Sequence, residues 1–174
     1  FPENPCNLIL SGENSFEFNF DFILRDHSNN QKTVFALVPK FTGLDIFPNQ
    51  TVITVTYEDG PQYYRLPLII KPDQNINVKF DHKPKQYFKV FINKEEVVNE
   101  ALTNKVFGIS DSPHILIGAG NFPNNNFNLN YSDIDYLSFS VSQDGNILAD
   151  HFFEERIFDK YVDITGNLNF IHKL

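Results

Sequence analysis

The sequence predicts an all-β fold, an antiparallel jelly-roll β-sandwich, on two observations. The first is the segment SFEFNFDFIL at Ser15–Leu24, in which Phe16, Phe18, Phe20 and Phe22 alternate with polar residues. Side chains on a strand point to opposite faces with period two, so these rings line one buried face that a second sheet must cover. The second is the recurrence of short apolar segments between polar turns at intervals of about 8 to 12 residues, which is typical of sandwiches and jelly rolls.

The composition fits one domain whose core is built from aromatic rings. The chain has 174 residues, with 19 Phe and 7 Tyr but no Trp and no Met, and this length can bury a core that folds alone. We expect a single domain over residues 1–174 with its core in residues 8–150. Residues 151–174 would either close the sandwich or begin a neighbouring segment. The chain starts at Phe1 rather than Met, as a processed or excised segment would.

Antiparallel hairpins are expected in the first half of the chain, where polar turns interrupt apolar alternation. They pair Ser15–Leu24 with Thr33–Val38, Thr51–Tyr57 with Gln62–Ile70, and Asn75–Phe80 with Tyr87–Ile92. Pro67 would mark an edge or a bulge in the second hairpin, because proline cannot donate to a strand ladder.

One short helix is expected at Glu95–Lys105, where Val97, Val98, Ala101 and Leu102 would form an apolar stripe. Further strands are expected at His114–Gly118, Tyr131–Val141, Leu148–Phe153 and Leu168–Ile171. The total is about ten to twelve strands, as in other sandwiches of this class.

The strand within Tyr131–Val141 is expected to divide its side chains between two faces by strict alternation. The two sets are Ile134, Tyr136, Ser138 and Ser140 on one side, and Asp135, Leu137, Phe139 and Val141 on the other.

Charge and cysteine content argue against several classes of function. The formal net charge is −8 and basic residues do not cluster, so nucleic acid is not an expected partner. No apolar run approaches the roughly 20 residues of a membrane helix, so membrane insertion is not expected. The lone Cys6 cannot form a disulfide within the chain. Two sequons, at Asn49 and Asn130, are either glycan attachment sites of a secreted protein or two ordinary loop asparagines.

Short segments in the second half match a known pattern. YFKVFINKEEV at Tyr87–Val97 ends a strand at Asn93-Lys94, HILIGAG follows, and YSDIDYLSFSV comes after a loop. These segments, with the opening SFEFNFDFIL, resemble a laminin G-like domain of the concanavalin-like jelly-roll superfamily, in which an Asn-Gly turn, a Leu-Tyr-Ile-Gly-Gly strand and a closing strand follow one another. Ser132-Asp133 replaces the glycine that precedes the family's closing strand, and Asp163–Asn167 resembles a segment that usually opens such domains. The order of the terminal strands therefore stays open.

Galectins are a second comparison, because they share the sandwich and a strand similar to Phe88–Asn93. Their galactose site needs His-x-Asn-x-Arg on one strand and a Trp on the next, whose face stacks on the sugar. This chain has His27 and Asn29 but Gln31 in place of the arginine, and no Trp. A galectin-type galactose site is not expected.

No catalytic arrangement is predicted. Glycosidases on this fold carry Glu-x-Asp-x-x-Glu on one strand, so that carboxylates converge on the scissile bond, and no such run occurs. Glu95, Glu96 and Glu100 lie on the expected helix, and Glu154-Glu155 are explained as a solvated face. The sequence therefore favours a protein that is not an enzyme.

Calcium is the cofactor that the laminin G-like resemblance implies, at a rim between the sheets. Carboxylates for it would come from Asp111, Asp133 and Asp135, and amide oxygens from Asn124, Asn125 and Asn126. Local hydrogen bonds in turns and at strand edges account for the same residues without a metal. The three asparagines are also candidate ligand-binding residues of a rim loop.

Tyrosines suit ligand binding, because each has an apolar ring and a polar tip. Tyr57, Tyr63, Tyr64 and Tyr87 are of this kind, and the adjacent pair Tyr63-Tyr64 is the predicted binding pair. The other place for a site is the polar face of the first strand, with Glu17, Asn19 and Asp21.

These observations favour a non-catalytic extracellular or secreted recognition module that binds a glycan or a protein through rim loops or a sheet face. One alternative is a structural or assembly subunit of a particle or toxin complex, in which the sandwich contacts copies of itself. A third is a glycan-processing enzyme without the usual motif. A polar sheet face with exposed tyrosine would favour glycan binding, whereas a flat apolar patch would favour a protein partner or self-association.

Overall fold

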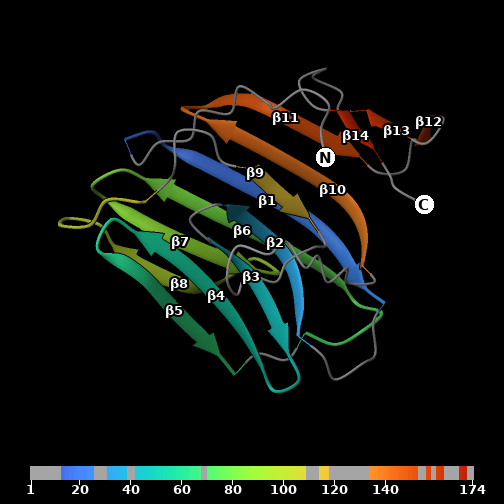
Figure 1. The fold of residues 1–174 in the computed structure, drawn as a ribbon, viewed down its shortest axis with the longest axis horizontal. Helices are drawn as coiled ribbons and strands as arrows, with labels where there is room; N and C mark the ends of the chain where they lie inside the picture. Colours follow the sequence, from blue (N-terminus) through green and yellow to red (C-terminus); the bar gives the residue numbers. More distant parts are fainter. Residues whose placement is uncertain are drawn as a thin grey trace.

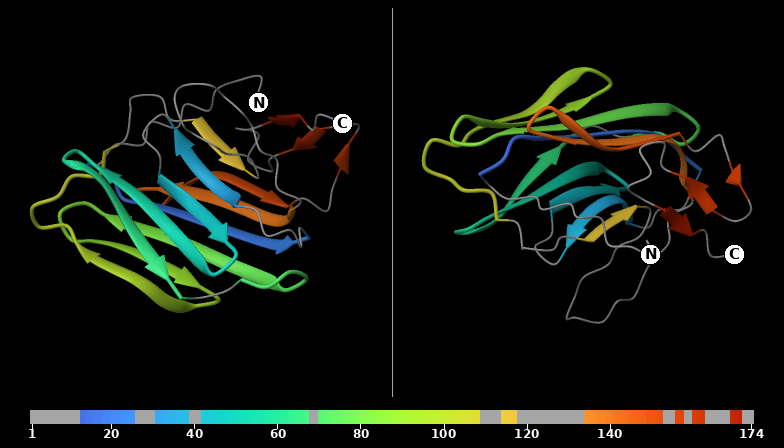
Figure 2. Two further views of the ribbon diagram at one scale, coloured as in Figure 1. Left: turned by 60° about the horizontal axis from the view of Figure 1, so that its bottom comes forward. Right: turned by 90° about the horizontal axis from the view of Figure 1, so that it is seen from above.

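The structure is a computed structural model that describes residues 13–25, 31–38, 42–67, 70–108, 114–117, 134–152, 156–157, 160–162 and 169–171. Within these ranges every regular element is a β-strand, and two antiparallel sheets lie face to face (Figures 1 and 2). The predicted antiparallel jelly-roll sandwich is confirmed. In the same ranges no helix is long and apolar enough to cross a membrane.

The larger sheet has six strands in the order β11-β10-β1-β6-β7-β8. They are β1 (Phe16–Leu24), β6 (Asn75–Lys83), β7 (Tyr87–Ile92), β8 (Glu95–Ala101), β10 (Ile134–Gln143) and β11 (Asn146–Phe152). β1 lies inside this sheet, paired with β6 along one edge and with β10 along the other.

The facing sheet has five strands in the order β5-β4-β3-β2-β9. They are β2 (Lys32–Val38), β3 (Thr42–Phe47), β4 (Gln50–Tyr57), β5 (Gly60–Leu66) and β9 (His114–Ile117). The chain crosses from one sheet to the other after β1, β5, β8 and β9. These crossings interleave the two layers, so segments distant in sequence become neighbours.

A small third sheet follows β11 (Figure 1). It contains β12 (Arg156–Ile157), β13 (Lys160–Val162) and β14 (Asn169–Ile171). Fourteen strands are present in the described part of the chain, more than the ten to twelve predicted. The single domain over residues 1–174, with its core in residues 8–150, stays a prediction, as does the role of residues 151–174 as a terminal extension.

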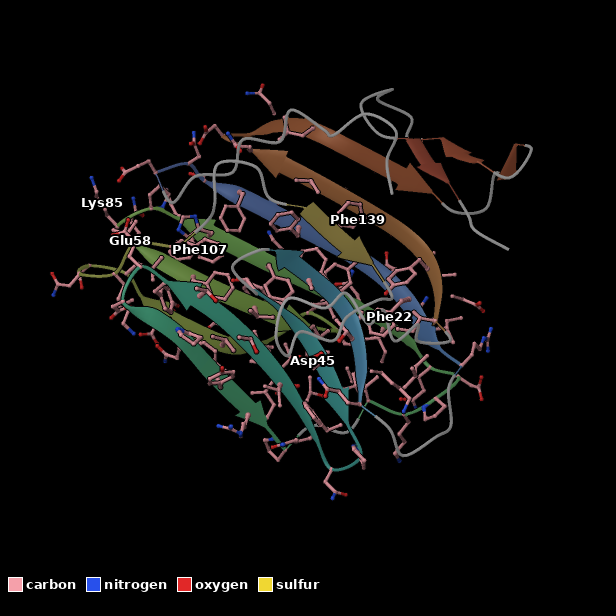
Figure 3. All side chains as sticks on the ribbon, viewed as in Figure 1. Phe22, Asp45, Glu58, Lys85, Phe107 and Phe139 are labelled. Carbon is pink, nitrogen blue, oxygen red and sulfur yellow. The ribbon has the colours of Figure 1, made fainter. Side chains whose placement is uncertain are left out.

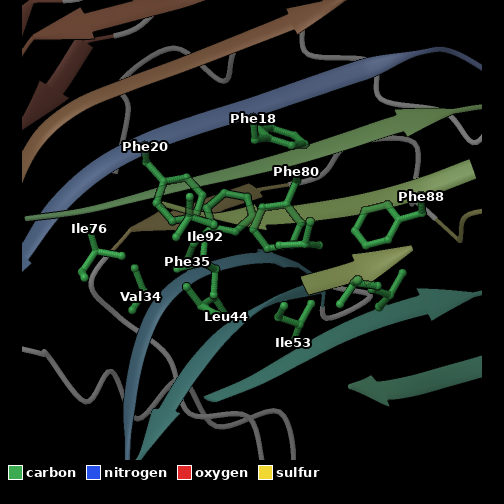
Figure 4. Packing of buried hydrophobic residues seen from close by; sticks show 14 of the residues in the cluster. Phe18, Phe20, Val34, Phe35, Leu44, Ile53, Ile76, Phe80, Phe88 and Ile92 are labelled. Carbon is green, nitrogen blue, oxygen red and sulfur yellow. The ribbon is translucent and has the colours of Figure 1, made fainter. Parts of the chain in front are cut away.

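The core between the two large sheets combines aromatic rings with aliphatic side chains (Figure 4). The four phenylalanines of β1 are at most 2% exposed, as their alternation predicted. Phe35 of β2 meets them from the other sheet, with its ring centroid 5.4 Å from Phe18, 5.3 Å from Phe20 and 5.7 Å from Phe80. With Phe139 of β10 at 6.5 Å, this one ring contacts rings on three strands of the six-stranded sheet.

The predicted hairpin between Ser15–Leu24 and Thr33–Val38 is wrong. β1 and β2 belong to different sheets, because β6 and β10 occupy both edges of β1. β2 pairs with β3 instead, a strand that no alternation predicted. A Cβ at Gly43 of β3 would lie 2.2 Å from the carbonyl oxygen of Phe35, so close approach of the two backbones requires glycine there. The other two predicted hairpins are confirmed as β4–β5 and β6–β7.

The predicted helix at Glu95–Lys105 is also wrong, since this segment contains strand β8. Asn93 and Lys94 have φ of 51° and 70° and form a two-residue turn that pairs β8 with β7. A register shift leaves Val97 as an extra residue, so that Val97 packs against the core beside the buried Val98. Two adjacent valines that both contact the core give a sequence pattern similar to the apolar stripe of a helix.

A second bulge changes the faces of β10. Phe22 pairs with Tyr136 and Asp21 pairs with Ser138, which leaves Leu137 as the extra residue. Tyr136 therefore faces the core on the same side as Phe139, and its hydroxyl donates to the carbonyl of Val34 in the opposite sheet. The predicted strict alternation through this strand is wrong at the bulge.

Replacing Phe35 with alanine should destabilise the fold by about 3–5 kcal/mol, because the cavity would remove contacts to rings on several strands. Urea unfolding measures the loss, with Phe35→Leu expected to cost clearly less. A loss for the alanine variant below about 1 kcal/mol, the range of an unremarkable substitution, would contradict the role of this ring.

Replacing Lys94 with glycine should stabilise the protein by about 0.5–1 kcal/mol, because it relieves a left-handed backbone in a non-glycine residue. Lys94→Ala is the matched control, since it removes the same charge and keeps the unfavourable φ. Thermal unfolding that ranks the alanine variant at or above the glycine variant would refute the turn geometry.

Candidate functional site

The outer face of the six-stranded sheet points away from the core and is polar. Figure 3 labels three rings of the core cluster, Phe22, Phe107 and Phe139. Its central residues come from three adjacent strands, and the strand registers place them on one side: Glu17, Asn19 and Asp21 of β1, Asn77, Lys79 and Asp81 of β6, and Ser138, Ser140 and Ser142 of β10. We call these residues the outer polar face. The predicted polar side of β1 is thus the middle of a wider polar surface.

Hydrogen bonds across the strands organise this face. Asp21 accepts from the side-chain amide of Asn77 at 2.8 Å and from the hydroxyl of Ser138 at 2.6 Å. One carboxylate therefore joins β6, β1 and β10 on the solvent side. Such cross-strand contacts hold side chains in place before a ligand arrives.

Lys79 joins two carboxylates at the next positions along these strands. Its ammonium nitrogen lies 3.1 Å from Glu17 and 3.6 Å from Asp81. Partial burial raises the pKa of Asp81 above its usual value, and the ammonium of Lys79 opposes that rise. The pair Glu17–Asp81 thus shares one cation.

A pocket of about 200 Å³ lies where the outer polar face ends, at the start of β1 and the end of β6. Its lining includes side chains that can bind polar groups: Glu17, Asp81, Lys83, Tyr87, Ser142 and Asp144. We call it the β1–β6 pocket. It combines hydrogen-bond donors and acceptors with the ring of Tyr87.

The turn between β10 and β11 forms one wall of this pocket. Asp144 and Gly145 have φ of 50° and 79°, as a two-residue hairpin turn requires. The carboxylate of Asp144 accepts from the backbone amide of Ser15 at 2.9 Å and from the side-chain amide of Asn14 at 2.6 Å. These bonds tie the turn to the start of β1.

Tyr87 forms the aromatic side of the pocket at the start of β7, opposite Lys83 in the strand register. The ammonium of Lys89 lies 5.3 Å from the centre of its ring, and the same ammonium is 2.8 Å from Glu96. The ammonium that contacts the ring of Tyr87 is thus held in place by an ion pair with Glu96 of β8.

His82 lies behind the pocket with its ring in the core. It is 1% exposed, its ring stacks on Phe16 with centroids 4.5 Å apart, and its Nδ1 donates to the carbonyl of Asn14 at 3.0 Å. Burial lowers the pKa of His82 to about 4, so the imidazole is neutral at physiological pH.

The predicted pair Tyr63-Tyr64 does not form one surface, because adjacent strand residues face opposite ways. Tyr63 is 52% exposed on β5, with the guanidinium of Arg65 5.6 Å from its ring centre. Tyr64 turns inward, and its hydroxyl lies 3.3 Å from that of Tyr57. Tyr57 itself is a core residue, with Lys105 5.1 Å from its ring centre.

Of the predicted calcium ligands the structure describes Asp135, and the calcium site stays a prediction. Asp135 accepts a hydrogen bond from Arg25 at 2.7 Å, and Arg25 also contacts Asp73 at 2.7 Å. The guanidinium of Arg25 thus joins two carboxylates, Asp73 and Asp135. Within the described ranges no three His, Cys, Asp or Glu side chains gather as metal ligands would.

Several predicted residues lie outside the described residues: Asp111, Asn124, Asn125, Asn126, Asn130 and Asp133, together with the galectin-like His27 and Asn29. Asn49 is described and is exposed in the turn between β3 and β4, where a glycan could be attached. Glycosylation at Asn49 and Asn130 stays a prediction.

Sequence reasoning identified part of the pocket and missed the rest. Glu17 was predicted from the polar side of β1, and Tyr87 was among the four tyrosines. Asp81, Ser142 and Asp144 were missed as site residues. The signal for Asp81 was the alternation of NINVKFDHK, whose outward positions continue the polar side of β1 once the two strands are paired.

No protein-family model and no curated protein sequence matches the chain. Solved structures share its fold. A candidate carbohydrate-binding protein from Bacteroides ovatus is 12% identical, with a TM-score of 0.62 over 94% of this chain and 53% of that protein. The receptor-binding domain of botulinum neurotoxin mosaic serotype C/D is 13% identical, with a TM-score of 0.52 over 83% of this chain and 34% of that one.

A structure of botulinum neurotoxin type C, whose cell entry is described as dependent upon interaction with two ganglioside molecules, is 18% identical. Its TM-score is 0.51 over 75% of this chain and 32% of that one. The chain spans about a third of the length of the toxin chains and about half that of the Bacteroides protein. At these identities the likeness shows a shared sandwich fold.

The buried His82 should make stability depend on pH. Its folded pKa of about 4 lies below the unfolded value, so stability is complete above about pH 6.5 and falls as pH drops from 6.5 to 4. The expected loss is about 3 kcal/mol, since one pKa unit corresponds to about 1.4 kcal/mol. His82→Phe should lack this component in urea unfolding at several pH values. Parallel pH profiles for the two proteins would contradict the assignment.

Proposed function

We propose that the chain is a non-catalytic glycan-binding module and that a sugar occupies the β1–β6 pocket. The observation that carries this proposal is a pocket with an aromatic ring beside carboxylate and hydroxyl groups on a polar sheet face. A sugar presents hydroxyl donors at its edge and C–H groups on its faces. The pocket offers acceptors for the first and the ring of Tyr87 for the second.

The carboxylates of the pocket are held ready for such a ligand. Glu17 and Asp81 are fixed by a shared ammonium on Lys79, and Asp144 by amides of the chain that leads into β1. A sugar hydroxyl that donates to an ionised carboxylate forms a charge-assisted hydrogen bond, which is stronger than a neutral one. Side chains already held in position lower the entropic cost of binding.

The same geometry argues for binding without hydrolysis. Glycosidases place two carboxyl groups on either side of the scissile bond, one of them protonated. Here Glu17 and Asp81 are neighbours on adjacent strands and face one ammonium. Two carboxylates that share one ammonium lie side by side and do not flank a bond between them.

A glycan fits the described surface better than a protein partner or self-association. Among the described residues the exposed large hydrophobic side chains are Tyr63 on β5 and Ile147 on β11, which lie in different sheets. They do not form the contiguous apolar patch that a protein interface needs. The likeness to a candidate carbohydrate-binding protein and to toxin receptor-binding domains supports the same choice.

An extracellular location belongs to this proposal, because the glycans that such modules bind are displayed outside cells. Attachment of a glycan at the exposed Asn49 in the native protein would support it.

Replacing Tyr87 with alanine should weaken glycan binding at least about tenfold, because an anchoring aromatic side chain in a pocket carries a large share of binding energy. The chain is screened on a glycan array with and without calcium, and the affinity of the best sugar is then measured by calorimetry. Binding should be equal with and without calcium, and the bound sugar should be recovered intact.

Tyr63→Ala is the matched control, since it removes the same ring from the exposed side of β5 in the other sheet. It should bind as the unaltered chain does. Loss of binding in Tyr63→Ala alone would move the site to β5. A chain that binds no sugar and elutes as a dimer or larger species in light scattering would refute glycan binding and favour assembly.

A further inference from the structure

The charges that line the β1–β6 pocket are unbalanced. Glu17, Asp81 and Asp144 contribute carboxylates and Lys83 contributes one ammonium. His82 adds no positive charge near neutral pH, because its imidazole is buried and uncharged. The lining is therefore negative before its immediate surroundings are considered.

Within the described part of the chain, contacts around the pocket reduce this charge without cancelling it. The ammonium of Lys79 serves both Glu17 and Asp81. Lys89 also acts on Asp81, but its ammonium forms an ion pair with Glu96. The carboxylate of Asp144 accepts hydrogen bonds from neutral donors, the backbone amide of Ser15 and the side-chain amide of Asn14. The whole chain carries a formal net charge of −8, which adds to the negative potential that a ligand meets.

We infer that the β1–β6 pocket selects sugars that are uncharged or carry an amine, and rejects sugars that carry a carboxylate. The inference rests on the proposed function and adds the chemical class of the ligand. Hydroxyl and ammonium groups donate to the carboxylates of Glu17 and Asp81, and an ammonium gains charge attraction as well. A carboxylate on the sugar would face like charges, which costs binding energy and provides selectivity.

The experiment compares sugars that differ only in charge. Immobilised oligosaccharides are used in matched pairs with and without a terminal sialic acid, together with the N-acetylglucosamine trimer and its de-acetylated amine form. Where a pair of sugars binds, the uncharged member should bind about tenfold more tightly than the sialylated member. The reason is that the carboxylate of sialic acid would face the carboxylates of the pocket. The amine trimer should bind at least as well as the acetylated one.

Added salt provides an independent test of the charge selectivity. Raising NaCl from about 0.15 M to 0.5 M screens charges, so the acidic members should gain relative to the uncharged ones. The affinity of uncharged members should change little, because hydrogen bonds and ring contacts are short-range.

Variants that remove one charge test whether the selectivity arises from the pocket carboxylates. Glu17→Gln and Asp81→Asn keep side-chain size and should reduce the preference against acidic sugars to about threefold or less, since fewer like charges remain. Glu95→Gln is the matched control, because it removes the same charge from the exposed start of β8, at the far end of β7 from Tyr87. Its selectivity should equal that of the unaltered chain.

The outcomes separate this inference from the proposed function. Tighter binding of sialylated members, lost in Tyr87→Ala, would overturn the charge selectivity and leave glycan binding at this pocket intact. Equal loss of selectivity in Glu95→Gln and Glu17→Gln would overturn the role of the pocket carboxylates. If none of the sugars binds, the proposed function, on which the inference rests, is overturned.

Discussion

The contact between the rings of β1 and Phe35 is the interaction on which the rest of the structure depends. It brings a strand inside the six-stranded sheet against the facing sheet, and both partners are almost completely buried. Because strand side chains alternate, burying these rings forces Glu17, Asn19 and Asp21 to the opposite side. A slip of one residue would expose the rings and bury the carboxylates, so the core also sets the register of the polar face.

The candidate site follows from that register. β6 and β10 pair with β1 over almost its whole length, so their outward side chains continue the polar face on both sides. The pocket forms where this face meets the turn between β10 and β11 and the start of β7. Its carboxylates come from segments more than 60 residues apart in sequence, as Glu17, Asp81 and Asp144 show.

Tyrosines have different positions in the two sheets of the sandwich. Tyr57 and Tyr64 lie where β4 and β5 approach β8, beside Lys105 and Glu100, which form an ion pair. Burial raises the pKa of Tyr57 far above its usual value, so its phenol stays protonated. Tyr57 is buried in the core and Tyr64 packs against it half-buried, whereas Tyr87 lines the pocket of the other sheet.

The sequence by itself determined the fold class, the buried face of β1, two of the three predicted hairpins and the polar character of the face that carries Glu17. Each of these follows from local alternation and turn chemistry, which a single strand expresses without its neighbours. Only the tertiary structure decided that β1 and β2 lie in different sheets, that Val97 and Val98 belong to a bulged strand, and that Asp135 pairs with Arg25. It also decided the pocket, because Asp81 and Asp144 meet Glu17 only through strand pairing across the chain. Strand pairing is a long-range choice between competing partners, and bulges change faces by one residue at places that alternation cannot predict.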